Sequence, residues 1–145
     1  MAVKLLVVDD EEVILRSVSR ILAREEYEIE TVQDAEEALR RVETAAYDLV
    51  ILDIMMPKVS GLEILQRVRE SHPDTDVIMI TGYASIESAV ETMKHGAMDY
   101  VQKPFAEDEL VDLVNKLVIR RKDRLEKETE PTIRLVTPSV RETES

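Results

Sequence analysis

Short apolar runs alternate with helix-like patterns along this chain, and the alternation limits the folds that it can adopt. The apolar runs predict five strands, at Val3–Val8, Glu28–Val32, Leu49–Asp53, Val77–Ile80 and Asp99–Gln102. Apolar residues recur at helical spacing in five further segments: Glu11–Glu25, one after Asp34, one after Ser60, Ser85–His95, and one from Glu107. Because strands alternate with helices, we expect an α/β fold with one parallel sheet and helices on both of its faces.

Several side chains mark the ends and inward faces of the predicted helices. Asp34 and Ser60 are predicted N-caps, and we expect Gly61 to let the preceding loop turn tightly. Gly96 stands after the fourth helix, where glycine commonly ends a helix. The fourth helix is expected to turn its apolar residues toward the core, namely Ile86, Ala89, Val90 and Met93.

Four of the five strands end in residues that suit phosphoryl chemistry. These residues are Asp9 and Asp10, Asp53, Thr81 and Lys103. Parallel strands place their carboxyl ends at one edge of the sheet, where ligands bind in folds of this kind, so we expect these side chains to lie together. Taken singly, each has an ordinary alternative: a solvated acidic loop, a turn, or a surface lysine.

Three carboxylates at one edge repel one another, by about 4 kcal/mol per close pair at an intermediate effective dielectric. Either some of them are protonated or a cation neutralises them, and Mg²⁺ suits because it favours carboxylates together with phosphate oxygens and water. One carboxylate can then act as a nucleophile toward a phosphoryl group. Asp53 is the expected nucleophile because its strand is the most central. Lys103 and the Thr81 hydroxyl would each contact a phosphoryl oxygen.

The composition argues against several other functions. A net charge of −12 disfavours nucleic acid as a direct partner and disfavours anionic membrane surfaces. The chain has no cysteine, hence no disulfide, zinc–thiolate site or thiol nucleophile. Its three glycines form neither a P-loop nor a Rossmann fingerprint. The apolar stretch before Asp9 is too short for a signal peptide or a membrane span, so we expect a cytoplasmic protein.

These motifs resemble the receiver domain of two-component response regulators, the CheY-like family, from about Val3 to Leu117. In order, they are Asp9-Asp10, Asp53 with Pro57 and Gly61 downstream, Thr81-Gly82, and Asp99-Tyr100 leading into Lys103-Pro104-Phe105. The stretches Thr81–Ala84 and Gly96–Tyr100 look most like receivers of the nitrogen-regulation type. The resemblance implies a doubly wound, flavodoxin-like (βα)5 fold with five parallel strands in the order 2-1-3-4-5.

The resemblance also implies a function, which is to accept a phosphoryl group on Asp53 from a sensor histidine kinase or a phosphotransfer protein. The Mg²⁺ ligands of the family correspond here to Asp10, Asp53 and the backbone carbonyl of Met55, with Asp9 acting through water. Such a domain is not an enzyme in the usual sense, because the phosphoryl group is transferred to the domain itself. It catalyses its own phosphorylation and then loses the phosphoryl group slowly. Met55 and Tyr83 stand at positions that tune this loss, and neither orients a water well, so we expect a persistent phosphorylated state.

Thr81 and Tyr100 resemble the switch pair of the family. Thr81 would move toward the phosphate and the Tyr100 ring would turn inward, repacking the face made by the fourth helix, fifth strand and fifth helix. That face would control a downstream protein target or an output domain, or form a phosphorylation-dependent homodimer. On position alone, Tyr100 could instead be an ordinary core aromatic. The resemblance further implies a cis peptide bond at Lys103-Pro104.

By sequence, the chain divides into a receiver domain at residues 1–122 and a C-terminal segment at residues 123–145. That segment extends the last helix and then becomes polar, which predicts a flexible tail, although Ile133, Leu135 and Val136 could dock on a partner or on this domain. The segment is too short and polar for an output domain, which leaves either a stand-alone receiver or the front of a longer regulator. Two other functions stay open: an unphosphorylated pseudo-receiver scaffold, and a flavodoxin-like nucleotide or flavin binder, which the acidic loops disfavour.

Overall fold

The structure is a computed structural model that describes residues 2–82 and 86–128. Strands and helices alternate throughout these residues, as the sequence predicts. In chain order the elements are β1 (Val3–Val8), α1 (Glu12–Leu22), β2 (Tyr27–Val32), α2 (Ala35–Thr44), β3 (Leu49–Asp53), α3 (Gly61–Ser71), β4 (Asp76–Thr81), α4 (Ile86–Lys94), β5 (Asp99–Gln102) and α5 (Glu107–Glu128). The five strand predictions are confirmed to within one residue at each end.

The five strands form one parallel sheet in the order β2-β1-β3-β4-β5. This confirms the predicted doubly wound, flavodoxin-like fold. Strands β3 and β4 are buried along their whole length, as continuous Val/Ile/Leu-rich runs in a parallel sheet should be. The order also places β1 and β3 side by side, so the acidic residues after β1 lie next to the end of β3.

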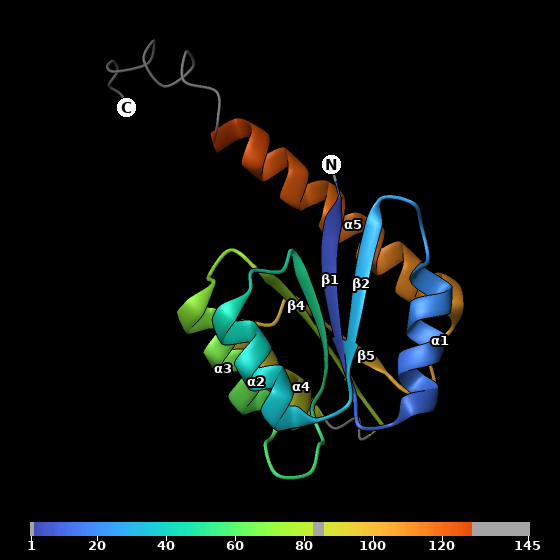
Figure 1. The fold of residues 1–145 in the computed structure, drawn as a ribbon, viewed down its shortest axis with the longest axis vertical. Coiled ribbons are helices and arrows are strands. Elements are labelled where there is room, and N and C mark those ends of the chain that lie inside the picture. Colours follow the sequence, from blue (N-terminus) through green and yellow to red (C-terminus); the bar gives the residue numbers. More distant parts are fainter. Residues whose placement is uncertain (1, 83–85, 129–145) are drawn as a thin grey trace. The chain divides into compact units, whose positions relative to one another are not determined.

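Helices cover both faces of the sheet. Helix α1 lies against one face, while α2 and α3 lie against the other and contact each other (Figure 1). The α2/α3 face holds the main hydrophobic core, to which the strands contribute alternate residues such as Leu6, Val8, Val50 and Leu52. This alternation follows from the two-residue period of a strand, which turns successive side chains to opposite faces.

By its internal contacts the chain separates into two compact units, Met1–Leu113 and Val114–Ser145. The division falls inside α5, so the predicted domain limit at residue 122 stays a prediction. The tail residues Ile133, Leu135 and Val136 lie outside the described residues. Among the helices at residues 2–82 and 86–128, none is both long enough and apolar enough to span a membrane.

The predicted helix caps are present, but one glycine is needed for a different reason. The side chains of Asp34 and Ser60 each accept a hydrogen bond from the backbone N–H three residues on, which satisfies a free donor of the first turn. Gly96 has a φ of +101°, as a glycine that ends a helix should. A Cβ at Gly61 would collide with the Asp53 carbonyl oxygen and lie 2.7 Å from Ile54 Cα, so close backbone approach requires this glycine.

Two expectations about the helices are wrong. Helix α1 ends at Leu22 because Ala23 adopts an extended conformation, three residues before the predicted end. In α4, Val90 and Met93 are each 46% exposed, although both were expected to face the core. Among the described side chains of α4, the buried one is Thr92, which lies between Val90 and Met93 in the sequence. The side chains of Ile86 and Ala89 lie outside the described residues.

Candidate functional site

Three carboxylates lie together at the carboxyl edge of the sheet, where the sequence predicts them. Asp9 and Asp10 follow β1, and Asp53 ends the adjacent strand β3. Each offers a carboxylate oxygen, and the three oxygens lie within 4.8 Å of one another. Asp9 and Asp53 are buried, at 2% and 4% exposed, whereas Asp10 is partly exposed. Burial of two acids next to a third is costly unless other groups compensate their charge.

Backbone groups of the neighbouring loops orient these acids. Asp9 Oδ1 accepts a hydrogen bond from the Glu11 N–H at 2.9 Å, and Asp53 Oδ1 accepts one from the Met55 N–H at 3.2 Å. Gln33 Nε2, from the loop after β2, donates to the Asp10 backbone carbonyl at 2.9 Å. The loops after β1 and β3 therefore orient the carboxylates of Asp9 and Asp53, and the loop after β2 holds the backbone of Asp10.

Lys103 directly follows β5, the strand at the edge of the sheet. Its side chain extends past β4 to the carboxylate cluster at the ends of β1 and β3. Its ammonium lies 2.9 Å from Asp9 Oδ2 and 3.5 Å from Asp53 Oδ2, and the side chain is 14% exposed. The Lys103 N–H donates to the Thr81 carbonyl at 2.8 Å, and the Lys103-Pro104 bond is cis, as the sequence resemblance implies. A fourth carboxylate, that of Glu11, also contacts the ammonium, at 3.0 Å. The sequence reading missed Glu11, whose only local signal is its position directly after the acidic pair.

Burial, together with an excess of negative charge over one lysine, determines the electrostatics of the site. Burial, reinforced by the charge of Asp9, raises the pKa of Asp53 to about 6. Burial also raises the pKa of Asp9, even though Lys103 and the Glu11 N–H act against it. Burial lowers the pKa of Lys103, but its hydrogen bonds to Asp9 and Glu11 outweigh that effect and raise the pKa well above its usual value. Oxygen donors with excess negative charge are the donor set that fits a hard divalent cation.

The two predicted switch residues lie on the neighbouring strands β4 and β5. Thr81 is fully buried at the end of β4, one residue beyond Ile80, the register partner of Asp53. Tyr100 lies on β5, where its partly buried ring packs against the core on the α2/α3 face. The Met55 side chain is 56% exposed in the loop after Asp53. Tyr83 lies outside the described residues.

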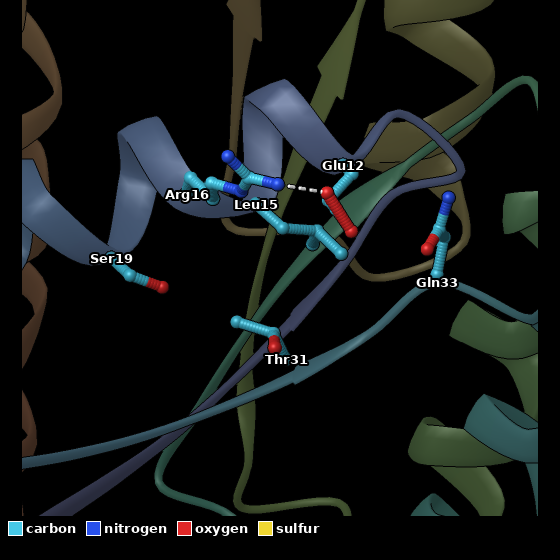
Figure 2. Close-up of a pocket in the computed structure, with 6 residues that line it drawn as sticks. All are labelled: Glu12, Leu15, Arg16, Ser19, Thr31 and Gln33. Atoms are coloured by element: carbon cyan, nitrogen blue, oxygen red, sulfur yellow. Dashed lines mark hydrogen bonds and ion pairs between the residues drawn. The ribbon is translucent and has the colours of Figure 1, made fainter.

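Two pockets open near this edge. One, of about 460 Å³, lies beside the acids and is lined by Asp10, Gln33, Asp34, Ala35, Met56, Pro57 and Lys58. The other, of about 510 Å³, lies between α1 and β2 (Figure 2). It is lined by Glu12, Leu15, Arg16, Ser19, Thr31 and Gln33, and an ion pair joins Glu12 to Arg16 across its wall. The second pocket contains no residue that the sequence assigns to the site.

Comparisons with known proteins agree with this geometry. Residues 5–115 match the response regulator receiver domain family. The transcriptional regulatory protein DltR of Streptococcus agalactiae is 42% identical over 108 residues, 74% of this chain and 48% of DltR. The nitrogen assimilation regulatory protein NtrX of Azorhizobium caulinodans is 38% identical over 138 residues, 90% of this chain and 30% of NtrX. A crystal structure of a CheY-like receiver domain protein from Methanospirillum hungatei JF-1 has a TM-score of 0.81 at 32% identity, covering 86% of this chain and 99% of that one.

The chain spans about half, or less, of the length of these curated relatives. The match to the family model extends from β1 into α5 and therefore includes every residue of the acidic cluster as well as Lys103. The predicted likeness to receivers, those of the nitrogen-regulation type included, is confirmed by this match and by NtrX. The chain belongs to the response regulator receiver domain family.

Proposed function

We propose that this chain accepts a phosphoryl group on Asp53 from the phosphohistidine of a sensor histidine kinase or a phosphotransfer protein. The observation that carries this proposal is the cluster of Asp9, Asp10 and Asp53, with oxygens within 4.8 Å and one lysine against them. Such a cluster is suited to binding a cation and a phosphoryl group at the same time. The protein would thus act in two-component signalling, as a regulator in the cytoplasm and not as a conventional enzyme.

The donor set fits Mg²⁺. Asp10, Asp53 and the Met55 backbone carbonyl would be its direct ligands, and Asp9 would act through water. When bound, Mg²⁺ would neutralise the acids and offset charge on the phosphoryl oxygens. A bound cation would favour the ionised form of the Asp53 carboxylate. Asp53 would then be ionised at neutral pH and able to act as a nucleophile.

The chain's own residues account for the transfer. The Asp53 carboxylate attacks phosphorus while the phosphorus–nitrogen bond to histidine breaks and the imidazole leaves with the electron pair. The Lys103 ammonium, 3.5 Å from Asp53 Oδ2, neutralises one phosphoryl oxygen, and the Thr81 hydroxyl donates to another. The thioether of Met55 is a poor partner for an attacking water, so loss of the phosphoryl group is slow. Tyr83 would share that tuning role.

The response would pass from Thr81 to Tyr100 and then to the surface of α4 and β5. Val90 and Met93 on α4 and Met98 just before β5 are exposed, so this surface already offers apolar contacts. Inward movement of Tyr100 would repack it and change its affinity for a protein target, an output domain or a second copy. The greater length of the curated relatives supports including an output domain among the candidate partners.

Phosphorylation by a small acyl phosphate tests the proposal. With Mg²⁺, the intact mass of the wild-type protein should increase by one phosphoryl group, and a chelator should prevent the increase. Asp53→Asn should prevent it as well, because an amide is not a nucleophile toward phosphorus at neutral pH. The proposal fails if the Asp53→Asn protein forms the same adduct at the wild-type rate.

A further inference from the structure

Glu11 occupies the N-cap position of α1, but its side chain does not cap the helix. Its backbone is extended, with φ of −94° and ψ of 112°, and within the described part of the chain its side chain makes no capping hydrogen bond. N-caps are usually Ser, Thr, Asp or Asn, whose short side chains reach the first-turn N–H groups. The Glu11 carboxylate instead reaches Lys103, at 3.0 Å and 92 positions away in the chain.

The Lys103 ammonium lies among three carboxylates and is drawn toward β1. Its nitrogen is 2.9 Å from Asp9 Oδ2 and 3.0 Å from Glu11 Oε1, but 3.5 Å from Asp53 Oδ2. An ammonium has three N–H donors, so the two β1-side acids occupy two of them. The longest of the three contacts is thus with Asp53, the residue that would accept the phosphoryl group.

Glu11 differs from the other acids around Lys103 in one respect. It is not one of the three acids whose oxygens lie close enough to hold one metal ion, which are Asp9, Asp10 and Asp53. Its side chain is 57% exposed. A cation that neutralises Asp9 and Asp53 weakens their attraction for the ammonium but leaves the Glu11–Lys103 contact in place. Glu11 is therefore the acid that continues to hold Lys103 when the site is ready for phosphoryl transfer.

We propose that Glu11 is a positioning residue that competes with the phosphoryl group on Asp53 for the Lys103 ammonium, and so lowers the affinity of the site for that group. This inference rests on the proposed function. As the phosphoryl group arrives, the ammonium moves away from Glu11 and donates to a phosphoryl oxygen, while water solvates the exposed Glu11 carboxylate. The movement breaks an ion pair and makes no covalent bond.

Binding of beryllofluoride, a mimic of the phosphoryl group, tests this idea. The wild-type, Glu11→Gln and Glu12→Gln proteins are titrated at saturating Mg²⁺, and the bound mimic is followed by ¹⁹F NMR. Glu12 is the matched control, because it is the next residue and loses the same charge, but it pairs with Arg16 in the wall of the pocket beside α1 (Figure 2). Glu11→Gln should bind the mimic about three- to fivefold more tightly, the range expected for release of one exposed ion pair, and Glu12→Gln should bind as wild type.

The direction of the affinity change and the NMR signal of Lys103 distinguish a positioning role of Glu11 from damage to the fold. Damage to the fold would weaken binding, whereas the proposal expects it to tighten. Without the mimic, Glu11→Gln should also shift the ¹³C NMR signal of Lys103 Cε, and Glu12→Gln should not. Equal or weaker binding by Glu11→Gln, or equal tightening by both variants, would overturn the inference. Failure of the wild-type protein to bind the mimic at all would overturn the proposed function and this inference with it.

Discussion

Two clusters of charged side chains lie along the strands of this sheet, and they differ in how their charges balance. The Tyr47 cluster, near the amino ends of β1 and β3, comprises Lys4, Glu30, Glu37, Arg41 and Tyr47, and pairs two cations with two carboxylates. Glu30 accepts a hydrogen bond from the Tyr47 hydroxyl at 2.8 Å and lies 3.3 Å from Arg41 and 3.8 Å from Lys4. Burial and Glu30 together raise the pKa of Tyr47 to about 12, so its hydroxyl stays protonated as a donor.

The carboxyl-edge cluster, formed by Asp9, Asp10, Asp53, Glu11 and Lys103, has four carboxylates against one ammonium. The Tyr47 cluster matches two cations with two carboxylates. The carboxyl-edge cluster has more carboxylates than cations, and burial, reinforced by the charge of Asp9, raises the pKa of Asp53 there. A balanced network supports a fold, and an unbalanced one is poised for ligands of the missing charge. The comparison predicts that equivalent changes in the two clusters will affect different properties of the protein.

The largest expected effect comes from removing the lysine of each cluster. Lys103→Ala should lower the rate of phosphorylation by a small acyl phosphate about a hundredfold or more, because a pre-placed positive group at the phosphoryl oxygens is lost. Lys4→Ala, which removes the same charge from the Tyr47 cluster, should leave the rate within about twofold of wild type, since surface pairs contribute little. Rates from intact mass spectra measure both. Equal losses in the two variants would break the distinction between the clusters.

A smaller effect concerns stability and pH. The pKa of Asp53 is about 6 in the folded state against 3.8 for a free side chain, so the folded state binds the proton more tightly. The resulting stabilisation is present below pH 3.8 and is lost as the pH rises through about 6. Without Mg²⁺, the free energy of unfolding should fall by on the order of 2 kcal/mol between pH 4 and pH 8, relative to Asp53→Asn. Urea unfolding of both proteins across this range measures the difference, and parallel curves would contradict it.

Removing the central acid of the Tyr47 cluster should destabilise the fold without affecting chemistry. Glu30→Ala leaves the Tyr47 hydroxyl without its acceptor and separates Arg41 from a partner. We expect a loss of about 1–2 kcal/mol in the free energy of unfolding, the usual cost of an unmet buried polar group. Phosphorylation of the folded variant should proceed at the wild-type rate. A slower rate at unchanged stability would mean that the two clusters are coupled.

The smallest expected effect is stabilisation by Mg²⁺ itself. At a Mg²⁺ concentration ten times the dissociation constant, the wild-type protein should gain about 1.4 kcal/mol of stability by mass action. Asp10→Asn should reduce that gain, while Glu30→Gln, in the balanced cluster, should keep it in full. Thermal unfolding with and without Mg²⁺ measures the gain. An undiminished gain in Asp10→Asn would remove Asp10 from the proposed ligand set.

The fold and most of the site could be predicted from sequence because local patterns and parallel topology determine them together. Continuous apolar runs identify buried strands such as β3, and parallel pairing brings every carboxyl end to one edge. Asp53 and Lys103 therefore converge although they are far apart in the chain. Caps such as Asp34 are equally local, since the capping hydrogen bond spans three residues.

The parts that could not be predicted depend on contacts that local patterns do not encode. In α4, the apolar residues lie at helical spacing, yet packing buries Thr92 and leaves Val90 and Met93 exposed. The reason for Gly61 appears only when the Asp53 carbonyl is placed against it. Glu11 joins the site through a contact with Lys103 that becomes visible only once the sheet is assembled.

The central claim is that Asp53 is the residue that carries the phosphoryl group. The protein can be phosphorylated with a small acyl phosphate and Mg²⁺, then treated with borohydride, which reduces an aspartyl phosphate to homoserine and leaves free carboxylates unchanged. Peptide mass spectrometry locates the reduced residue. The account predicts homoserine at position 53 alone. Reduction at Asp9 or Asp10, or none in a protein that has gained a phosphoryl group, would contradict it.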